Sequence, residues 1–213
     1  MKRAVRTYRA VEELRAEFEL RREAIRARLA DFAAVKSEQY FFELVYCLLT
    51  PQSSAVNAGK AVALLEARGI CTDCAELAAL LHQQAFYIRF HNTKARHILE
   101  AQEKFAEIAL QIAGDQDAER LRAWLVSNVK GLGWKEASHF LRNIGRRDLA
   151  ILDRHILRNL KRHQVIHSLP KTLTKKQYCT IEKQFARFAE AIGISMDELD
   201  LLFWSRETGE ILK

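Results

Sequence analysis

Lys135 and Asp153 are the two side chains of this sequence whose positions suit nucleophilic attack on an electrophilic carbon. Lys135 falls in the first turn of an expected helix. The positive end of a helix, together with burial, favours the neutral and nucleophilic form of an amine. Asp153 stands at the head of a later expected helix, where backbone N–H groups would keep its carboxylate charged, able to orient a nucleophile or stabilise an oxocarbenium-like centre. The plain structural alternatives are an exposed first-turn lysine and an N-cap aspartate.

The lysine is positioned by a Gly-x-Gly turn, Gly131 and Gly133, between two expected helices. Glycines let the backbone turn tightly and approach another surface closely. The N–H groups at the start of the second helix lack partners, and with the helix dipole they favour an anion such as a DNA phosphate. We therefore expect a helical hairpin over about 117–145 that holds a duplex without reading its sequence, with Lys130 and Trp134 as further DNA contacts.

Composition agrees with a polyanionic partner and a helical chain. The 213 residues carry a formal net charge of +7, and they include only two prolines and eight glycines to interrupt helices. The longest apolar runs are too short to span a bilayer, and the N-terminus lacks the apolar core of a signal peptide. We therefore expect a cytoplasmic protein associated with nucleic acid.

Apolar periodicity and capping residues predict an all-α fold. We find no strand pattern, no repeat and no sharp linker, so residues 1–213 are expected to form a single unit. A capping box is expected at Ser195 and Glu198. A long helix is expected to start at a cap on Asn92 or Thr93. The expected helices are 5–32, 38–49, about 54–68, 75–82, 92–113, 117–129, from 134 onward, 154–163, 174–191 and from 196 to about 204.

The cysteines predict no metal centre. Only Cys71 and Cys74 have the spacing of a metal or redox pair, and the chain lacks a matching second pair. We expect free thiols in or near packed helices.

The segments KGLGWKEASHFLRNIG (130–145) and DLAILDRH (148–155) resemble the helix-hairpin-helix-GPD DNA glycosylases. Within that superfamily the chain is most similar to the second family of 8-oxoguanine DNA glycosylase/AP lyases, found in archaea and some bacteria. The resemblance extends over nearly the whole chain. It implies an all-α fold of two helical subdomains with the active site in the cleft between them.

The resemblance also implies a reaction. Lys135 matches the nucleophile of the family and Asp153 its second catalytic residue. The implied enzyme flips 8-oxoguanine out of duplex DNA, excises it through a lysine Schiff base and cuts the strand by β-elimination. It acts in base-excision repair as a monomer at the nucleoid. It needs no redox cofactor or catalytic metal, although hairpins of this type can hold a monovalent cation through backbone carbonyls.

The base pocket implied by the resemblance involves residues far from the hairpin. Phe90 and Trp204 match aromatics that sandwich the flipped base, whereas the alternative is ordinary core packing. The C-terminal carboxylate of Lys213 would accept a hydrogen bond from N7–H of 8-oxoguanine, and the alternative is a frayed terminus. Gln52 is a candidate to fill the gap left in the duplex or to touch the opposite base. Arg154 serves either a phosphate contact or a solvated helix face.

Two other functions remain open at this point. Endonuclease III-like glycosylases act on other damaged bases and often carry a four-cysteine iron–sulfur cluster after the catalytic aspartate, but only Cys179 lies in that region here. A non-catalytic helix-hairpin-helix module would bind DNA alone, and binding needs neither Lys135 nor Asp153 at this spacing.

Overall fold

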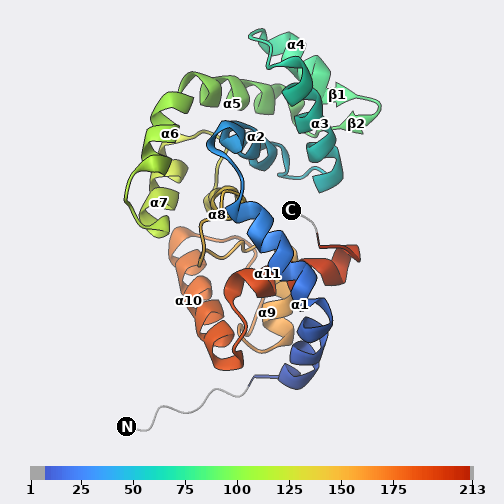
Figure 1. Cartoon of the computed structure of the whole chain (residues 1–213), viewed down its shortest axis with the longest axis vertical. Helices are drawn as coiled ribbons and strands as arrows, with labels where there is room; N and C mark the ends of the chain where they lie inside the picture. Colours follow the sequence, from blue (N-terminus) through green and yellow to red (C-terminus); the bar gives the residue numbers. More distant parts are fainter. Residues whose placement is uncertain (1–7, 212–213) are drawn as a thin grey trace. The chain divides into compact units, whose positions relative to one another are not determined.

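The computed structural model describes residues 8–211, and Figure 1 shows how these residues form helices with one small strand pair. The chain divides into two compact units. The terminal unit contains the described residues up to Ala33 and resumes at Gly145, and the central unit spans Ala34–Ile144. Within residues 8–211, no helix has the length and apolar character needed to cross a membrane.

Within its described residues, the terminal unit has four helices: α1 (Val11–Ala33), α9 (Arg154–Arg162), α10 (Lys175–Ile192) and α11 (Met196–Thr208). Helix α11 packs against α1, α9 and α10. The predicted capping box at Ser195 and Glu198 is confirmed, and Thr174 and Gln177 form a second one. Helix α1 begins at Val11, because Ala10 takes a positive φ of 51°, and residues 5–7 of the expected helix lie outside the described residues. A left-handed residue cannot continue a right-handed helix, so α1 begins after it.

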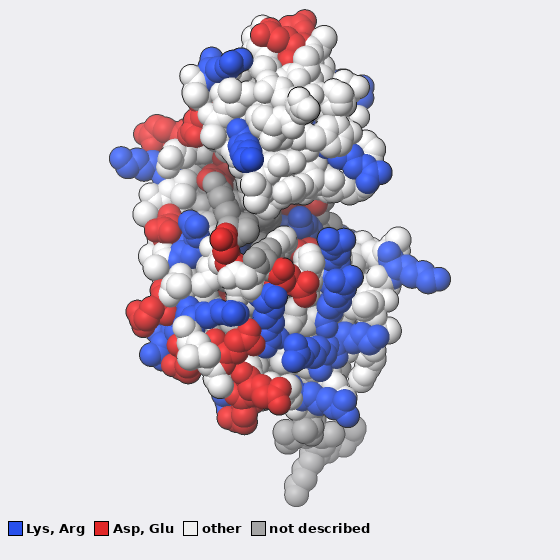
Figure 2. All heavy atoms as spheres, turned by 90° about the vertical axis from the view of Figure 1, so that its right-hand side faces the viewer, with Lys and Arg blue, Asp and Glu red and all other residues white. Residues whose placement is uncertain are grey.

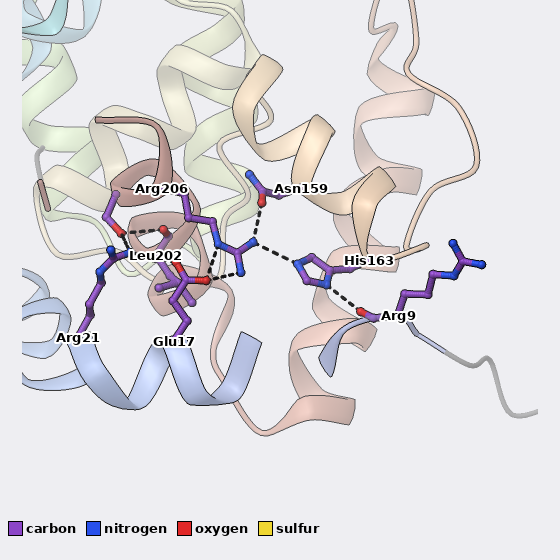
Figure 3. A network of polar contacts seen from close by, with 8 residues as sticks. Arg9, Glu17, Arg21, Asn159, His163, Leu202 and Arg206 are labelled. Carbon is purple, nitrogen blue, oxygen red and sulfur yellow. Dashed lines mark hydrogen bonds and ion pairs between the residues drawn. The ribbon is translucent and has the colours of Figure 1, made fainter. Parts of the chain in front are cut away.

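A polar network fixes α11 within the terminal unit (Figure 3). Arg206 contacts the Glu17 carboxylate of α1 through Nε at 2.8 Å and Nη2 at 2.6 Å. Its Nη1 donates to Asn159 Oδ1 at 2.8 Å and lies 3.2 Å from His163 Nε2. Because a guanidinium only donates, His163 Nε2 must accept, and Nδ1 then donates to the Arg9 carbonyl at 2.8 Å. The network therefore holds His163 in its neutral form.

The central unit is built around α2 and α8. Its elements in chain order are η1 (Ser37–Gln39), α2 (Tyr40–Leu49), α3 (Ala55–Arg68), α4 (Cys74–Leu81), β1 (His82–Gln83), β2 (Phe86–Tyr87), α5 (His91–Glu103), α6 (Phe105–Ala113), α7 (Ala118–Asn128) and α8 (Trp134–Asn143). Helix α8 packs against α2 and α7, and α2 also packs against α3 and α5. Residues 43–49 of α2 and 137–143 of α8 are buried. The core of this unit therefore supports the start of α8.

The expectation of no strands was wrong for one short hairpin. His82 pairs with Tyr87 and Gln83 with Phe86 in an antiparallel ladder. Strands of two residues are too short to show an alternating pattern, so sequence periodicity could not reveal them.

The expected helix 92–113 was wrong at its start and in its middle. Helix α5 begins at His91 after Phe90, which has φ 60° and ψ 33°, so neither Asn92 nor Thr93 is the cap. The helix is interrupted at Lys104, which has φ −92° and ψ 0°. No proline or glycine marks either position, so tertiary packing overrides the uniform helix propensity of this segment.

Candidate active site

The turn that precedes Lys135 depends on Gly131. Gly131 has a φ of +87°, and a Cβ there would lie 2.5 Å from His97 Nδ1 and 3.0 Å from Leu48 Cδ2. Gly133 is different, because its φ of −85° and ψ of −178° are open to any residue. A Cβ on Gly133 would meet only Glu136 Oε2, at 2.8 Å. Of the two glycines expected to shape the turn, only Gly131 has a backbone conformation that favours glycine.

Lys135 lies in the first turn of α8 with a partly buried side chain, 26% exposed. Its Nζ is 3.8 Å from Glu136 Oε1. Gly133, the N-cap, offers no side-chain hydrogen bond to the helix start. First-turn N–H groups can thus serve an incoming anion. The structure thus places a partly buried amine in the first turn of a helix that has no side-chain cap.

Trp134 and Lys130 flank this turn in different environments. The guanidinium of Arg122 lies over the Trp134 ring, 4.9 Å from its centroid, and its Nη1 donates to Ser138 Oγ at 3.0 Å. Arg122 is only 1% exposed, so its charge holds α7 and α8 together in a desolvated setting, where a cation–π contact contributes about 2 kcal/mol. Lys130 is exposed, and its Nζ lies 3.0 Å from Glu100 Oε2. Such an exposed ion pair contributes little and can exchange for a phosphate contact.

Asp153 is the N-cap of α9, as the sequence predicted. Its Oδ1 accepts from the backbone N–H groups of His155 at 2.7 Å and Ile156 at 2.8 Å. Among residues 8–211, Oδ2 accepts no hydrogen bond from a neighbour. One carboxylate oxygen thus anchors the group while the other is available to a ligand.

Helix α9 presents a basic face. Its exposed residues are Arg154, Arg158, Lys161 and Arg162, while Ile156, Leu157 and Leu160 are buried on the opposite side. Figure 2 shows one face of the molecule, on which Lys and Arg side chains gather in one region with Asp and Glu side chains among them. A basic surface of this kind suits the DNA backbone.

Trp204 lies beside the start of α9. Its ring centroid is 5.1 Å from that of His155, whose Nδ1 is 3.2 Å from Glu207 Oε2. Trp204 is partly exposed, in contrast to the buried residues 199–203 that precede it on α11. In the terminal unit, Asp153, His155 and Trp204 are therefore neighbours.

Phe90 and Gln52 both have left-handed backbones in the central unit. Phe90 has φ 60° and is 50% exposed, under the Arg89 guanidinium at 4.9 Å from the ring centroid. Core packing, the alternative for Phe90, was therefore wrong. Gln52 has φ 55° and an exposed side chain in the turn between α2 and α3. Such backbones are uncommon outside glycine and are concentrated at functional sites.

Comparisons with known proteins decide the family. A model of the 8-oxoguanine DNA glycosylase family matches residues 25–194. The chain belongs to this family. It is 43% identical to the 8-oxoguanine DNA glycosylase/AP lyase of Fusobacterium nucleatum over 80% of this chain and 81% of that protein.

Solved structures of 8-oxoguanine DNA glycosylases share the fold. The Thermotoga maritima enzyme matches with a TM-score of 0.85 and 35% identity, over 95% of this chain and 98% of that one. A Methanocaldococcus jannaschii 8-oxoguanine glycosylase/lyase, in complex with 15mer DNA containing 8-oxoguanine, matches with a TM-score of 0.84 and 31% identity. That match covers 94% of this chain and all of the other, 100%. The predicted all-α helix-hairpin-helix-GPD fold is thereby confirmed.

In this 8-oxoguanine DNA glycosylase, the residues predicted to form the site fall into two groups. The central unit carries Lys135 with Gln52, Phe90, Lys130, Gly131, Gly133 and Trp134, and the terminal unit carries Asp153 with Arg154 and Trp204. Lys213 lies outside the described residues. Within 8–211, no group of three or more His, Cys, Asp or Glu side chains could hold a metal ion. Cys71 and Cys74 are free, and burial raises the pKa of the Cys71 thiol.

One residue of this glycosylase was missed by reasoning from sequence. Lys94 is 5% exposed, and its Nζ donates to the carbonyl oxygens of Leu49 and Pro51, each at 2.7 Å, and to Ser53 Oγ at 3.0 Å. A signal was present in the sequence, because Lys94 falls on the same helical stripe as the buried Ile98 and Ala101.

Proposed function

We propose that this chain is a bifunctional DNA glycosylase/AP lyase of base-excision repair, which excises 8-oxoguanine from duplex DNA and then cuts the strand. Family membership supports the substrate, and the Methanocaldococcus jannaschii relative is described in complex with DNA containing 8-oxoguanine. The observation that carries the chemistry is the position of Lys135, a half-buried amine in the first turn of α8. Binding alone would not need an amine there.

The proposed reaction begins with extrusion of the damaged nucleotide, because C1′ is shielded inside the duplex. Lys135 Nζ bonds to C1′ as the bond from C1′ to the base breaks and 8-oxoguanine leaves with a proton. The sugar then opens at its ring oxygen, which gives a Schiff base between C1′ and the lysine. Loss of a proton from C2′ breaks the bond between C3′ and its oxygen, and the strand is cut 3′ to the lesion.

Asp153 supports this sequence electrostatically. Its anchored carboxylate keeps one oxygen free of bonds to the described residues, so it can accept a proton from the amine or face positive charge on the sugar.

The base and its neighbours are assigned to the remaining predicted residues. Phe90 and Trp204 would stack on the extruded purine, and each exposes aromatic surface. The terminal carboxylate of Lys213 would accept from N7–H, which 8-oxoguanine has and guanine lacks. Gln52 would occupy the gap in the duplex, and Arg154 would contact phosphate.

The hairpin would hold the DNA backbone through Lys130, the exposed Gly131 and Gly133, and the start of α8 at Trp134. No metal or redox cofactor takes part in the proposed chemistry. The carbonyl oxygens of Lys130, Gly131 and Leu132 accept no hydrogen bond from residues 8–211, and such oxygens suit a monovalent cation that would hold a phosphate.

Because the substrate is chromosomal DNA, we place the enzyme in the cytoplasm at the nucleoid. We further propose that it acts as a monomer.

Borohydride trapping tests this proposal. A duplex with one 8-oxoguanine is incubated with the protein and reduced, and the covalent adduct is measured. We expect an adduct with the wild type, none with Lys135→Gln, and an undiminished one with Lys60→Gln, an exposed lysine of α3 outside the proposed site. Asp153→Asn keeps a good N-cap and removes the charge, so we expect it to fold and to lose activity on the order of a hundredfold.

The outcomes separate the rival functions. Tight binding without adduct or strand cleavage would leave a non-catalytic DNA-binding module. Excision of another damaged base with no action on 8-oxoguanine would indicate an endonuclease III-like specificity. An adduct that persists in Lys135→Gln would refute the assignment of the nucleophile.

A further inference from the structure

The buried lysine of α5 has an unusual set of partners. The three acceptors of Lys94 Nζ match the three donors of an ammonium, and none of them is a carboxylate. One is the carbonyl of Leu49, the last residue of α2, where the helix dipole is negative. Burial lowers the pKa of Lys94 to about 8, so at neutral pH the group remains charged with all three donors in place. A buried charge without an ionic partner is costly, which suggests a purpose beyond packing.

All three acceptors belong to the segment that carries Gln52. Ser53 N donates to the Thr50 carbonyl at 3.0 Å, which closes a four-residue turn with Pro51 second and Gln52 third. The positive φ of Gln52, 55°, is the signature of a type II turn, which normally requires glycine or asparagine at the third position. Type I and type II turns differ by a flip of the central peptide, whose carbonyl here is that of Pro51.

Lys94 therefore holds the atom whose orientation defines the turn. Its Nζ binds the Pro51 carbonyl at 2.7 Å and so fixes the central peptide in the type II orientation. Without that bond, glutamine would favour the type I conformation, in which the third residue has a negative φ. The Gln52 side chain would then leave the chain in another direction.

The same amine is connected to Phe90. Ser53 Oγ, which accepts from Lys94 Nζ, also accepts from the backbone N–H of Arg89 at 3.0 Å. The Phe90 carbonyl accepts from the backbone N–H of Lys94 at 3.0 Å. Gln52 and Phe90, both left-handed and both exposed, thus share one anchor.

We propose that Lys94 is a positioning residue that holds Gln52 and Phe90 as one rigid pair for engaging the extruded base and the gap it leaves. This inference rests on the proposed function and deepens it. Lys94 itself touches no DNA in this assignment, because its amine is fully occupied within the protein.

A double-mutant cycle tests the inference. Single-turnover excision of 8-oxoguanine from a duplex is measured for the wild type, Lys94→Met, the double variant Gln52→Ala/Phe90→Ala, and the combination of all three substitutions. We expect Lys94→Met to slow excision on the order of tenfold to a hundredfold, as misplacement of binding groups does. In the background without the Gln52 and Phe90 side chains, the same substitution should change the rate less than about twofold.

Controls keep the inference open to refutation. Lys60→Met, an exposed lysine of α3, should leave excision unchanged. If Lys94→Met does not fold, Ser53→Ala removes the link to Arg89 while keeping both carbonyl bonds, and it should slow excision only when Phe90 is present. An equal loss from Lys94→Met in both backgrounds would show a merely structural role and overturn the inference. Absence of excision by the wild type would instead refute the proposed function.

Discussion

The two glycines of the hairpin should differ in how strongly the same substitution destabilises the fold. In Gly131→Ala, the new Cβ would lie 2.5 Å from His97 Nδ1 and 3.0 Å from Leu48 Cδ2, on a backbone with φ +87°. The left-handed conformation costs an L-residue about 1–2 kcal/mol, and insertion into a packed contact adds about 1–3 kcal/mol. We therefore expect the free energy of unfolding to fall by roughly 2–5 kcal/mol.

Gly133→Ala provides the matched control. Its backbone conformation is open to alanine, and the Cβ would meet only the end of the flexible Glu136 side chain. Alanine lowers the entropy of the unfolded chain, which stabilises a protein by about 0.4–1 kcal/mol at a compatible position. Displacement of the carboxylate opposes this gain, so we expect a net change within about 1 kcal/mol.

Urea unfolding of the wild type and both variants measures the difference. Two of the three tryptophans, Trp124 and Trp134, lie on α7 and α8, so tryptophan fluorescence reports mainly on the hairpin, with Trp204 of α11 adding a signal from the terminal unit, and circular dichroism reports on all helices. Two-state analysis requires that the two probes agree. Equal destabilisation by the two substitutions, or a larger effect of Gly133→Ala, would refute the reasoning from φ and from the His97 contact.

Two further predictions concern His163 of the terminal unit and Phe90 of the central unit. Burial, with the adjacent Arg206 cation, lowers the pKa of His163, so the fold favours the neutral ring. The contribution of His163 to the free energy of unfolding should therefore be constant above the unfolded pKa of about 6.5 and fall as the pH drops below it. Thermal unfolding from pH 7.5 to 5 should show a smaller loss of stability on acidification in His163→Gln than in the wild type. Phe90→Ala should leave the unfolding free energy within about 1 kcal/mol of the wild type, because the ring is half exposed, yet reduce excision of 8-oxoguanine. Ile88→Ala, at a fully buried neighbour, should instead cost about 2–5 kcal/mol of stability, and an equal loss from Phe90→Ala would contradict its placement at the surface.

The sequence alone determined the features that depend on neighbouring residues. Asp153 caps α9 and Ser195 caps α11, because a short polar side chain reaches the N–H groups two or three positions onward whatever the rest of the fold does. The Gly-x-Gly between α7 and α8 was visible for the same reason. The family resemblance carried over Lys135 as the proposed nucleophile, because motif and spacing are properties of the chain.

Tertiary structure decided what depends on residues distant in the chain. Gly131 is confined to glycine by His97 and Leu48, whereas Gly133 is not, and no local pattern distinguishes the two. The left-handed Gln52 and Phe90 are linked through Lys94 of α5, which lies 41 to 45 positions from its three acceptors. Local propensity favours an ordinary turn at Pro51, with a negative φ at Gln52. A single ammonium buried between these segments decides otherwise, because its three hydrogen bonds can be made together only in the folded chain.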